Sequence, residues 1–127
     1  PVYFAWDDKF NFYYISQPKS RHMNNTKKNS KSVLTIFSTN FSPDDDVFGV
    51  YVEGNAVIVP DDQVESAYNA YFKRRFPKTG KGDKPFTENQ GEKAAGKFVK
   101  IIPTHMWYFD TRFFDEVRVE IPISALK

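Results

Sequence analysis

Three consecutive residues, Ser20, Arg21 and His22, offer hydrogen-bond donors of three different kinds to a single ligand. A guanidinium presents a planar fork of N–H groups that matches phosphate oxygens, and a hydroxyl and an imidazole add further donors. Serine is also favoured just before a helix, where unpaired backbone N–H groups and the helix dipole attract an anion. The triplet therefore predicts a phosphate-binding helix start.

The elements around the triplet must place it beside the end of a strand. Residues 12–16 are aromatic and β-branched, which is typical of a strand. Pro18 ends this strand because proline has no N–H to donate to a ladder. Residues 33–37 form a second apolar run of strand length. The polar, Asn-rich segment between them predicts a short helix, so we expect strand, turn, short helix and strand over residues 13–37.

A purely structural interpretation of the triplet also stays open from the residues alone. Ser20 could only cap the helix, Arg21 could pair with a surface carboxylate, and His22 could face solvent. A cationic first turn is the reverse of what the helix dipole favours. A bound phosphate would remove that conflict, whereas the structural interpretation leaves it in place.

The order of these motifs resembles one known family. The chain resembles the pyridoxamine 5'-phosphate oxidase-like split β-barrel family in the order of five features. These are an aromatic strand, the turn at residues 20–22, a short Asn-containing helix, a Gly-containing strand region at 47–59 and a helix ending at 75–77 (RFP). The resemblance covers nearly the whole chain. Members of that family are typically homodimers that bind FMN. The resemblance implies that the triplet holds the flavin phosphate and that Ile15 and Ser16, at the end of the preceding strand, line the flavin site.

A tryptophan on a late strand completes the implied site. Trp107 lies in a segment that resembles the flavin-side strand of the family, where tryptophan is common, although packing inside a barrel explains it equally well. The cofactor-binding residues that the resemblance implies are Ile15, Ser16, Ser20, Arg21, His22 and Trp107. No catalytic residue is assigned, because flavin supplies the redox chemistry itself and no triad or acid–base pair is evident.

The C-terminal segment argues against one specific activity. Pyridoxamine-phosphate oxidases carry an R-x-H-x-R-type motif that binds their substrate, and residues 112–127 lack it. We therefore expect an FMN-dependent oxidoreductase of unknown substrate that has no pyridoxamine-phosphate oxidase activity. Two alternatives stay open. One is a non-catalytic module of the same fold that binds another planar ligand such as haem, or no cofactor. The other is a barrel that binds nucleic acid through aromatic and lysine side chains.

The composition limits the remaining classes of protein. A net charge of +2 is too small to argue for nucleic acid by itself. The absence of cysteine excludes disulfides, thiol catalysis and zinc–thiolate sites, and two histidines are too few for a histidine metal site. No apolar run approaches the ~20 residues of a membrane span, and no signal peptide is visible. We therefore expect a cytoplasmic protein without a metal or a membrane anchor.

The remaining segments predict an antiparallel split β-barrel with two peripheral helices. The expected strands cover residues 1–6, 10–15, 33–37, 47–59, 98–102, 105–109 and 117–123. Pro103 separates two of them, since proline interrupts a ladder. Residues 78–96 hold most of the glycines and few apolar side chains, which predicts a long loop.

The second helix is expected over residues 61–76. Asp61 or Asp62 would cap it, and Tyr68 and Phe72 would lie on its buried face. The aromatic content of 17% indicates more apolar surface than one small core covers. We expect a single domain over residues 1–127, without the N-terminal helix and first strand of the family, that forms a homodimer with the flavin at the interface.

Overall fold

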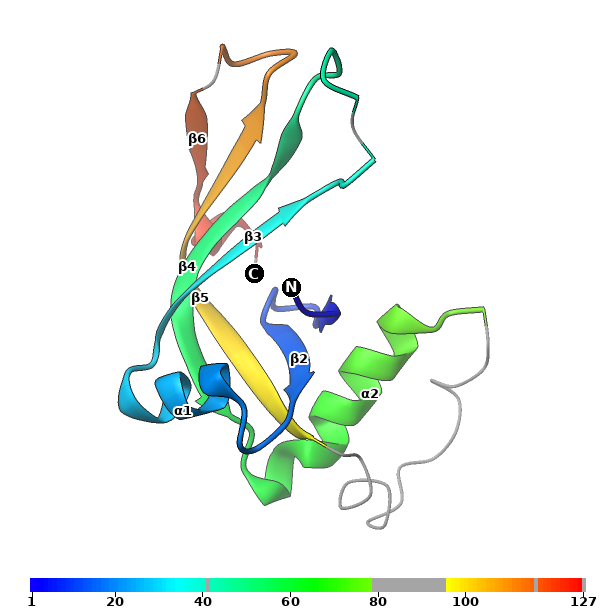
Figure 1. Cartoon of the computed structure of the whole chain (residues 1–127), viewed down its shortest axis with the longest axis vertical. Helices are drawn as coiled ribbons and strands as arrows, with labels where there is room; N and C mark the ends of the chain where they lie inside the picture. Colours follow the sequence, from blue (N-terminus) through cyan, green and yellow to red (C-terminus); the bar gives the residue numbers. More distant parts are fainter. Residues whose placement is uncertain (41, 79–95, 116, 127) are drawn as a thin grey trace.

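The computed structural model describes residues 1–40, 42–78, 96–115 and 117–126, and it places two helices at one end of a long antiparallel sheet (Figure 1). The strands are β1 (Phe4–Trp6), β2 (Phe12–Ser16), β3 (Lys31–Phe37), β4 (Phe48–Ile58), β5 (Lys97–Asp110) and β6 (Arg118–Ile121), and the helices are α1 (Arg21–Lys28) and α2 (Val64–Arg75). A short 3-10 turn at Asp61–Gln63 precedes α2, and another at Ile123–Leu126 follows β6. Most of the loop expected over residues 78–96 lies outside the described residues.

The strand β5 organises the sheet. One edge of β5 pairs with β4 along almost the whole length of β5. The other edge pairs with β2 near the start of β5 and with β6 near its end. The strand order is β1-β2-β5-β4-β3, with β6 beside β5. Closure of a barrel requires the edge strands to hydrogen-bond to each other. Among the described strands, β1 and β3 lie at opposite edges and do not pair, so the sheet is open and closure of the expected split β-barrel is not observed.

The expected break at Pro103 is wrong, because residues 97–110 form one continuous strand. The register shifts at this point: Glu53 of β4 pairs with His105, whereas the next residue of β4, Gly54, pairs with Pro103. Thr104 is therefore an extra residue on β5, as in a β-bulge. A bulge is one of the few places within a sheet that tolerates the missing N–H of proline.

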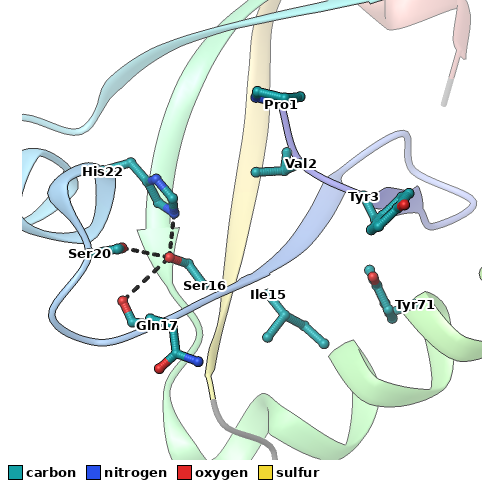
Figure 2. Close-up of a pocket in the computed structure, with 9 residues that line it drawn as sticks. All are labelled: Pro1, Val2, Tyr3, Ile15, Ser16, Gln17, Ser20, His22 and Tyr71. Atoms are coloured by element: carbon teal, nitrogen blue, oxygen red, sulfur yellow. Dashed lines mark hydrogen bonds between the residues drawn. The ribbon is translucent and has the colours of Figure 1, made fainter.

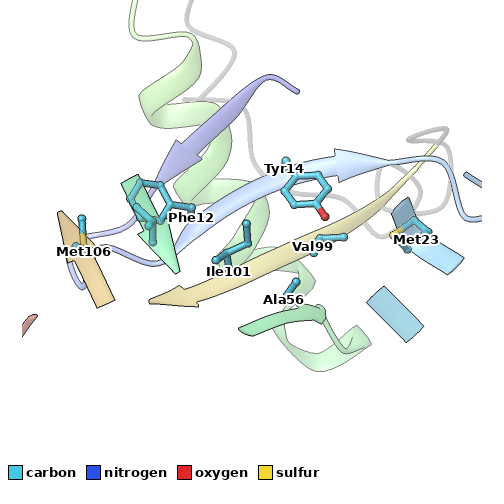
Figure 3. Packing of buried hydrophobic residues seen from close by; sticks show 8 residues of the cluster. Phe12, Tyr14, Met23, Ala56, Val99, Ile101 and Met106 are labelled. Atoms are coloured by element: carbon cyan, nitrogen blue, oxygen red, sulfur yellow. The ribbon is translucent and has the colours of Figure 1, made fainter. Parts of the chain in front are cut away.

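The sheet carries a hydrophobic cluster on each face, because successive side chains of a strand point to opposite sides. On one face lie Phe12, Tyr14, Met23, Val52, Ala56, Val99, Ile101 and Met106 (Figure 3). On the other face, α2 covers a cluster of Ala5, Tyr13, Val59, Ala67, Tyr68, Tyr71 and Phe98. Strand β2 thus contributes to both clusters, and the expected packing of Tyr68 and Phe72 beneath α2 is confirmed.

The start of α2 differs from the prediction. Asp61 and Asp62 do not cap the helix, since both lie in the preceding 3-10 turn and Gln63 occupies the capping position without a side-chain hydrogen bond. The N–H of Gln63 instead donates to the carbonyl of Pro60 at 2.9 Å. A 3-10 turn is a common way to satisfy backbone groups at a helix end, so no carboxylate cap is needed here.

Candidate functional site

The segment that carries Ser20, Arg21 and His22 folds as predicted. Strand β2 ends at Ser16, α1 begins at Arg21, and β3 follows at Lys31. Ser20 has extended backbone angles and its hydroxyl accepts a hydrogen bond from the N–H of Met23 at 3.4 Å. The predicted capping role of Ser20 is therefore confirmed, and the helix start stands directly beside the end of a strand.

The side chains of Ser16, Ser20 and His22 converge on one point, and we call them the hydroxyl–imidazole cluster (Figure 2). Ser16 Oγ lies 2.8 Å from Ser20 Oγ and is hydrogen-bonded to Nε2 of His22. It also lies 3.4 Å from the carbonyl oxygen of Gln17. Ser16 has a single hydroxyl proton and cannot donate to all three partners at once. The cluster can therefore redirect its protons toward a ligand without moving its heavy atoms.

Two further contacts hold His22, one at its ring and one at its backbone. The ring of Tyr14 stands edge-on to it with 6.0 Å between centroids, and Thr26 donates from its hydroxyl to the His22 carbonyl at 2.9 Å. Tyr14 belongs to the hydrophobic cluster, and burial raises the pKa of its phenol despite an opposing hydrogen bond with Thr26. The packing of Tyr14 thus connects the position of His22 to the core.

A pocket of about 650 Å³ opens beside this cluster. Its volume lies within the range of about 300–1,000 Å³ that is usual for small-molecule sites. Val2 and Ile15 form part of its apolar wall, and the rings of Tyr3 and Tyr71 form another part. The pocket therefore joins a polar end, made by the hydroxyl–imidazole cluster, to a mostly apolar body.

The structure brings four of the six sequence-predicted site residues to this pocket: Ile15, Ser16, Ser20 and His22. Arg21 is the neighbour of two of them and its side chain is exposed on the first turn of α1 rather than lining the pocket. Its backbone position, between Ser20 and His22, places it next to the polar end of the pocket.

Trp107 is not brought to the pocket within one chain. Ser16 pairs with Lys97 at the start of β5, and Trp107 lies ten residues beyond Lys97 on the same strand. At a rise of about 3.3 Å per residue, the separation is about 30 Å. Trp107 instead contacts the ring of Tyr51 edge-on, with 5.6 Å between centroids, and stacks on His105 at 5.7 Å.

Sequence reasoning missed the other residues that line the pocket, which are Pro1, Val2, Tyr3, Gln17 and Tyr71, and also Gly96 next to it. Tyr71 lies on the apolar face of α2, where the helical pattern indicates core packing and gives no sign of a pocket. Gly96 is buried against the end of β2, where an added Cβ would come within 2.6 Å of Ile15 Cγ2 and 2.8 Å of the Ser16 carbonyl oxygen. A side chain at residue 96 would therefore push on the strand end that carries Ser16.

Neither a metal-binding cluster nor a membrane-spanning helix is found in the part of the chain that the structure describes. That part contains no group of three or more His, Asp or Glu side chains placed to hold a metal ion. None of its helices is long and apolar enough to cross a membrane.

No protein-family model matches the chain, and no curated protein matches its sequence. Solved structures do match. A heme binding protein from Mycobacterium smegmatis superposes with a TM-score of 0.68 at 9% identity over 98% of this chain and 47% of that one. A conserved hypothetical protein from Mycobacterium tuberculosis superposes with a TM-score of 0.63 at 17% identity, over 95% of this chain and 73% of that one. A protein of unknown function from Agrobacterium tumefaciens superposes with a TM-score of 0.65 at 11% identity, over 85% of this chain and 42% of that one.

These similarities concern the fold alone. Identities of 9–17% carry no residue-level assignment, and one fold can host many functions. The chain also spans less than half the length of two of these three proteins. The resemblance to the flavin-binding family therefore stays a prediction.

Proposed function

We propose that the pocket beside α1 binds FMN, with the phosphate at the hydroxyl–imidazole cluster. The observation that carries the proposal is the convergence of Ser16, Ser20 and His22 at the start of a helix. The first N–H groups of a helix have no intrahelical partner, and together with the dipole they favour an anion. The exposed guanidinium of Arg21 stands one residue away and can add a bidentate contact.

The rest of the pocket suits the ring system of such a cofactor. Its apolar wall of Val2 and Ile15 and its two tyrosine rings offer flat contact surface, and its volume of about 650 Å³ is that of a small-molecule site. Bound FMN would supply the electron transfer, for which the protein need not provide a catalytic side chain. The residues of this chain would bind the phosphate, hold the ring and exclude water from it.

Haem is the second candidate, and the structural match to a protein named as heme binding favours it. His22 is the histidine that lines the pocket, so it would be the axial ligand. In this structure, however, Nε2 of His22 is engaged by the hydroxyl of Ser16. Iron ligation through that atom would require the loss of this hydrogen bond, whereas a phosphate could accept from the Ser20 hydroxyl and the first N–H groups of α1 while the bond stays in place. The geometry therefore supports FMN better.

A second copy of the chain would complete the site. Several apolar side chains are exposed at the end of the sheet away from the helices: Phe37 is 54% exposed, Phe113 is 71% and Val117 is 60%. Apolar patches on a protein surface often mark an interface. Since Trp107 is about 30 Å from the pocket of its own chain, it would reach a flavin only from the other subunit of a homodimer.

The absorbance spectrum of the purified protein tests this function. We expect flavin bands, and FMN as the compound released on denaturation. His22→Ala should lower the FMN content, whereas His105→Ala, which changes the histidine outside the pocket, should not. A Soret band that disappears in His22→Ala would instead identify the pocket as a haem site, and a colourless protein that binds neither added ligand would contradict both functions.

A further inference from the structure

The end of the pocket opposite the hydroxyl–imidazole cluster holds a second group of polar side chains. Figure 2 shows Tyr3 and Tyr71 on the far side of Ile15 from Ser16 and His22. Tyr71 is buried on α2, with 7% of its surface exposed, and Tyr3 comes from the segment before β1. The two tyrosines thus bring hydroxyl groups to the part of the pocket farthest from the proposed phosphate.

A cation stands over the ring of Tyr3 and beside the hydroxyl of Tyr71. Arg75 is the last residue of α2, and its guanidinium carbon lies 4.4 Å from the centroid of the Tyr3 ring. Burial raises the pKa of the Tyr71 phenol, and the adjacent Arg75 guanidinium opposes this through its charge and a hydrogen bond. Two hydroxyls of the pocket lining therefore meet a guanidinium that stands beside the lining, and all three groups can donate hydrogen bonds.

The position of Arg75 is not explained by the helix dipole alone. A dipole favours cations in the last turn of a helix, and Lys73, Arg74 and Arg75 all lie there. Arg74, however, pairs with Asp8 and lies over the ring of Trp6 at 5.1 Å, and neither of these residues lines the pocket. Arg75 differs from Arg74 because it contacts two residues that line the pocket.

We propose that Arg75, Tyr3 and Tyr71 form a second polar end of the pocket, which recognises an acceptor-rich edge on the ring system of the bound ligand. The inference rests on the proposed function, in which the first polar end takes the phosphate. Donors at both ends and apolar walls between them select a planar heterocycle whose carbonyl oxygens and ring nitrogens lie on the edge remote from its phosphate. The pyrimidine edge of a flavin has this chemistry.

The test compares three ligands that share a ring but differ in their tails: FMN, riboflavin, which lacks the phosphate, and lumiflavin, which also lacks the ribityl chain. Arg75→Gln should lower the affinity for all three ligands by a similar factor of about ten, since a charged hydrogen bond to the ring of the ligand is lost in each case. The matched control Arg74→Gln should change none of them. Tyr71→Phe keeps the ring and should produce a smaller loss, again equal for the three ligands.

The readouts separate recognition from folding. Arg75→Lys keeps the charge without the planar fork and should give an intermediate loss, which keeps the proposal testable if the glutamine variant unfolds. A loss confined to FMN would assign Arg75 to the phosphate and overturn the proposal, as would affinities unchanged from wild type. If the wild-type protein binds none of the three flavins, the proposed function itself fails and this inference falls with it. Normal wild-type binding with an unaffected Arg75→Gln removes only the inference.

Discussion

Ser16 and Trp107 lie on neighbouring strands of one sheet but at opposite ends of it. Ser16 is opposite Lys97, where β5 begins, and Trp107 is ten residues further along β5 beside Tyr51. The separation of about 30 Å means that one pocket cannot use both residues of the same chain. If both contact one flavin, a second subunit must supply Trp107, and this consequence can be tested by mixing subunits.

Subunit mixing should restore binding between two defective variants. His22→Ala and Trp107→Ala would each damage both sites of a homodimer. In a mixed dimer, one site carries both substitutions and the other carries neither. Random exchange of equal amounts should therefore recover about a quarter of the wild-type FMN capacity in equilibrium dialysis, because half of the dimers are mixed and each has one intact site.

The control for this experiment mixes His22→Ala with Arg21→Ala. Both residues belong to the same end of one chain, so no mixed dimer would have an intact site and no capacity should return. Failure of the His22→Ala and Trp107→Ala mixture to exceed this control would contradict the shared site.

Arg21→Ala should weaken FMN binding and leave riboflavin binding nearly unchanged. Arg21 is the exposed first residue of α1, next in the chain to Ser20 of the proposed phosphate site, and one charged hydrogen bond contributes about 1.5–3 kcal/mol. Calorimetric titration of both flavins measures the difference. Lys28→Ala at the other end of α1 is the matched control, and an equal loss in the two variants would show that Arg21 acts only through general charge.

Asp7 should stabilise the β1–β2 hairpin through its side chain. Its carboxylate accepts hydrogen bonds from the backbone and side-chain N–H groups of Asn11 at 2.9 Å each, and from the Tyr13 hydroxyl at 3.0 Å. Asp7→Ala removes the acceptor of these groups and should lower the free energy of unfolding by about 2–3 kcal/mol. Asp8→Ala breaks only a surface ion pair with Arg74 and should cost less than about 1 kcal/mol. Urea unfolding of both variants checks the order.

The stability of the protein should fall in acid partly because of Asp110. Hydrogen bonds from Arg112 hold the pKa of this buried carboxyl well below its ordinary value of 3.8, and a hydrogen bond from Tyr108 adds to the effect. A carboxyl whose pKa is lower in the folded state stabilises fully above the unfolded value and loses this contribution as the pH falls below it. The unfolding free energy of Asp110→Asn should therefore depend less on pH than that of wild type below about pH 4. Parallel curves for the two proteins would contradict this assignment.

The local part of the site was predictable because its signals are local. The proline after β2, the serine before α1 and the polar helix between two apolar runs are all read within residues 12–37, and the structure has the corresponding strand, cap, helix and strand there. Ser16, which the resemblance placed at the strand end, does meet Ser20 and His22.

The parts that failed depend on contacts between distant segments. Pro103 indicates a break when β5 is read alone, but the register with Glu53 and Gly54 of β4 accommodates it as a bulge. The contribution of Tyr3 and Tyr71 to the pocket depends on how the first residues of the chain lie against α2. Neither arrangement follows from local propensity, because each requires knowledge of which segments become neighbours.

The central claim is that the hydroxyl–imidazole cluster reads a phosphate, and the most direct measurement is the ratio of the FMN and riboflavin dissociation constants of the wild-type protein. The two ligands share their ring and ribityl chain and differ in the phosphate alone. We predict that calorimetric titration gives FMN an affinity higher by about ten- to a hundredfold, the equivalent of one charged hydrogen bond. Equal affinities for FMN and riboflavin would contradict the account.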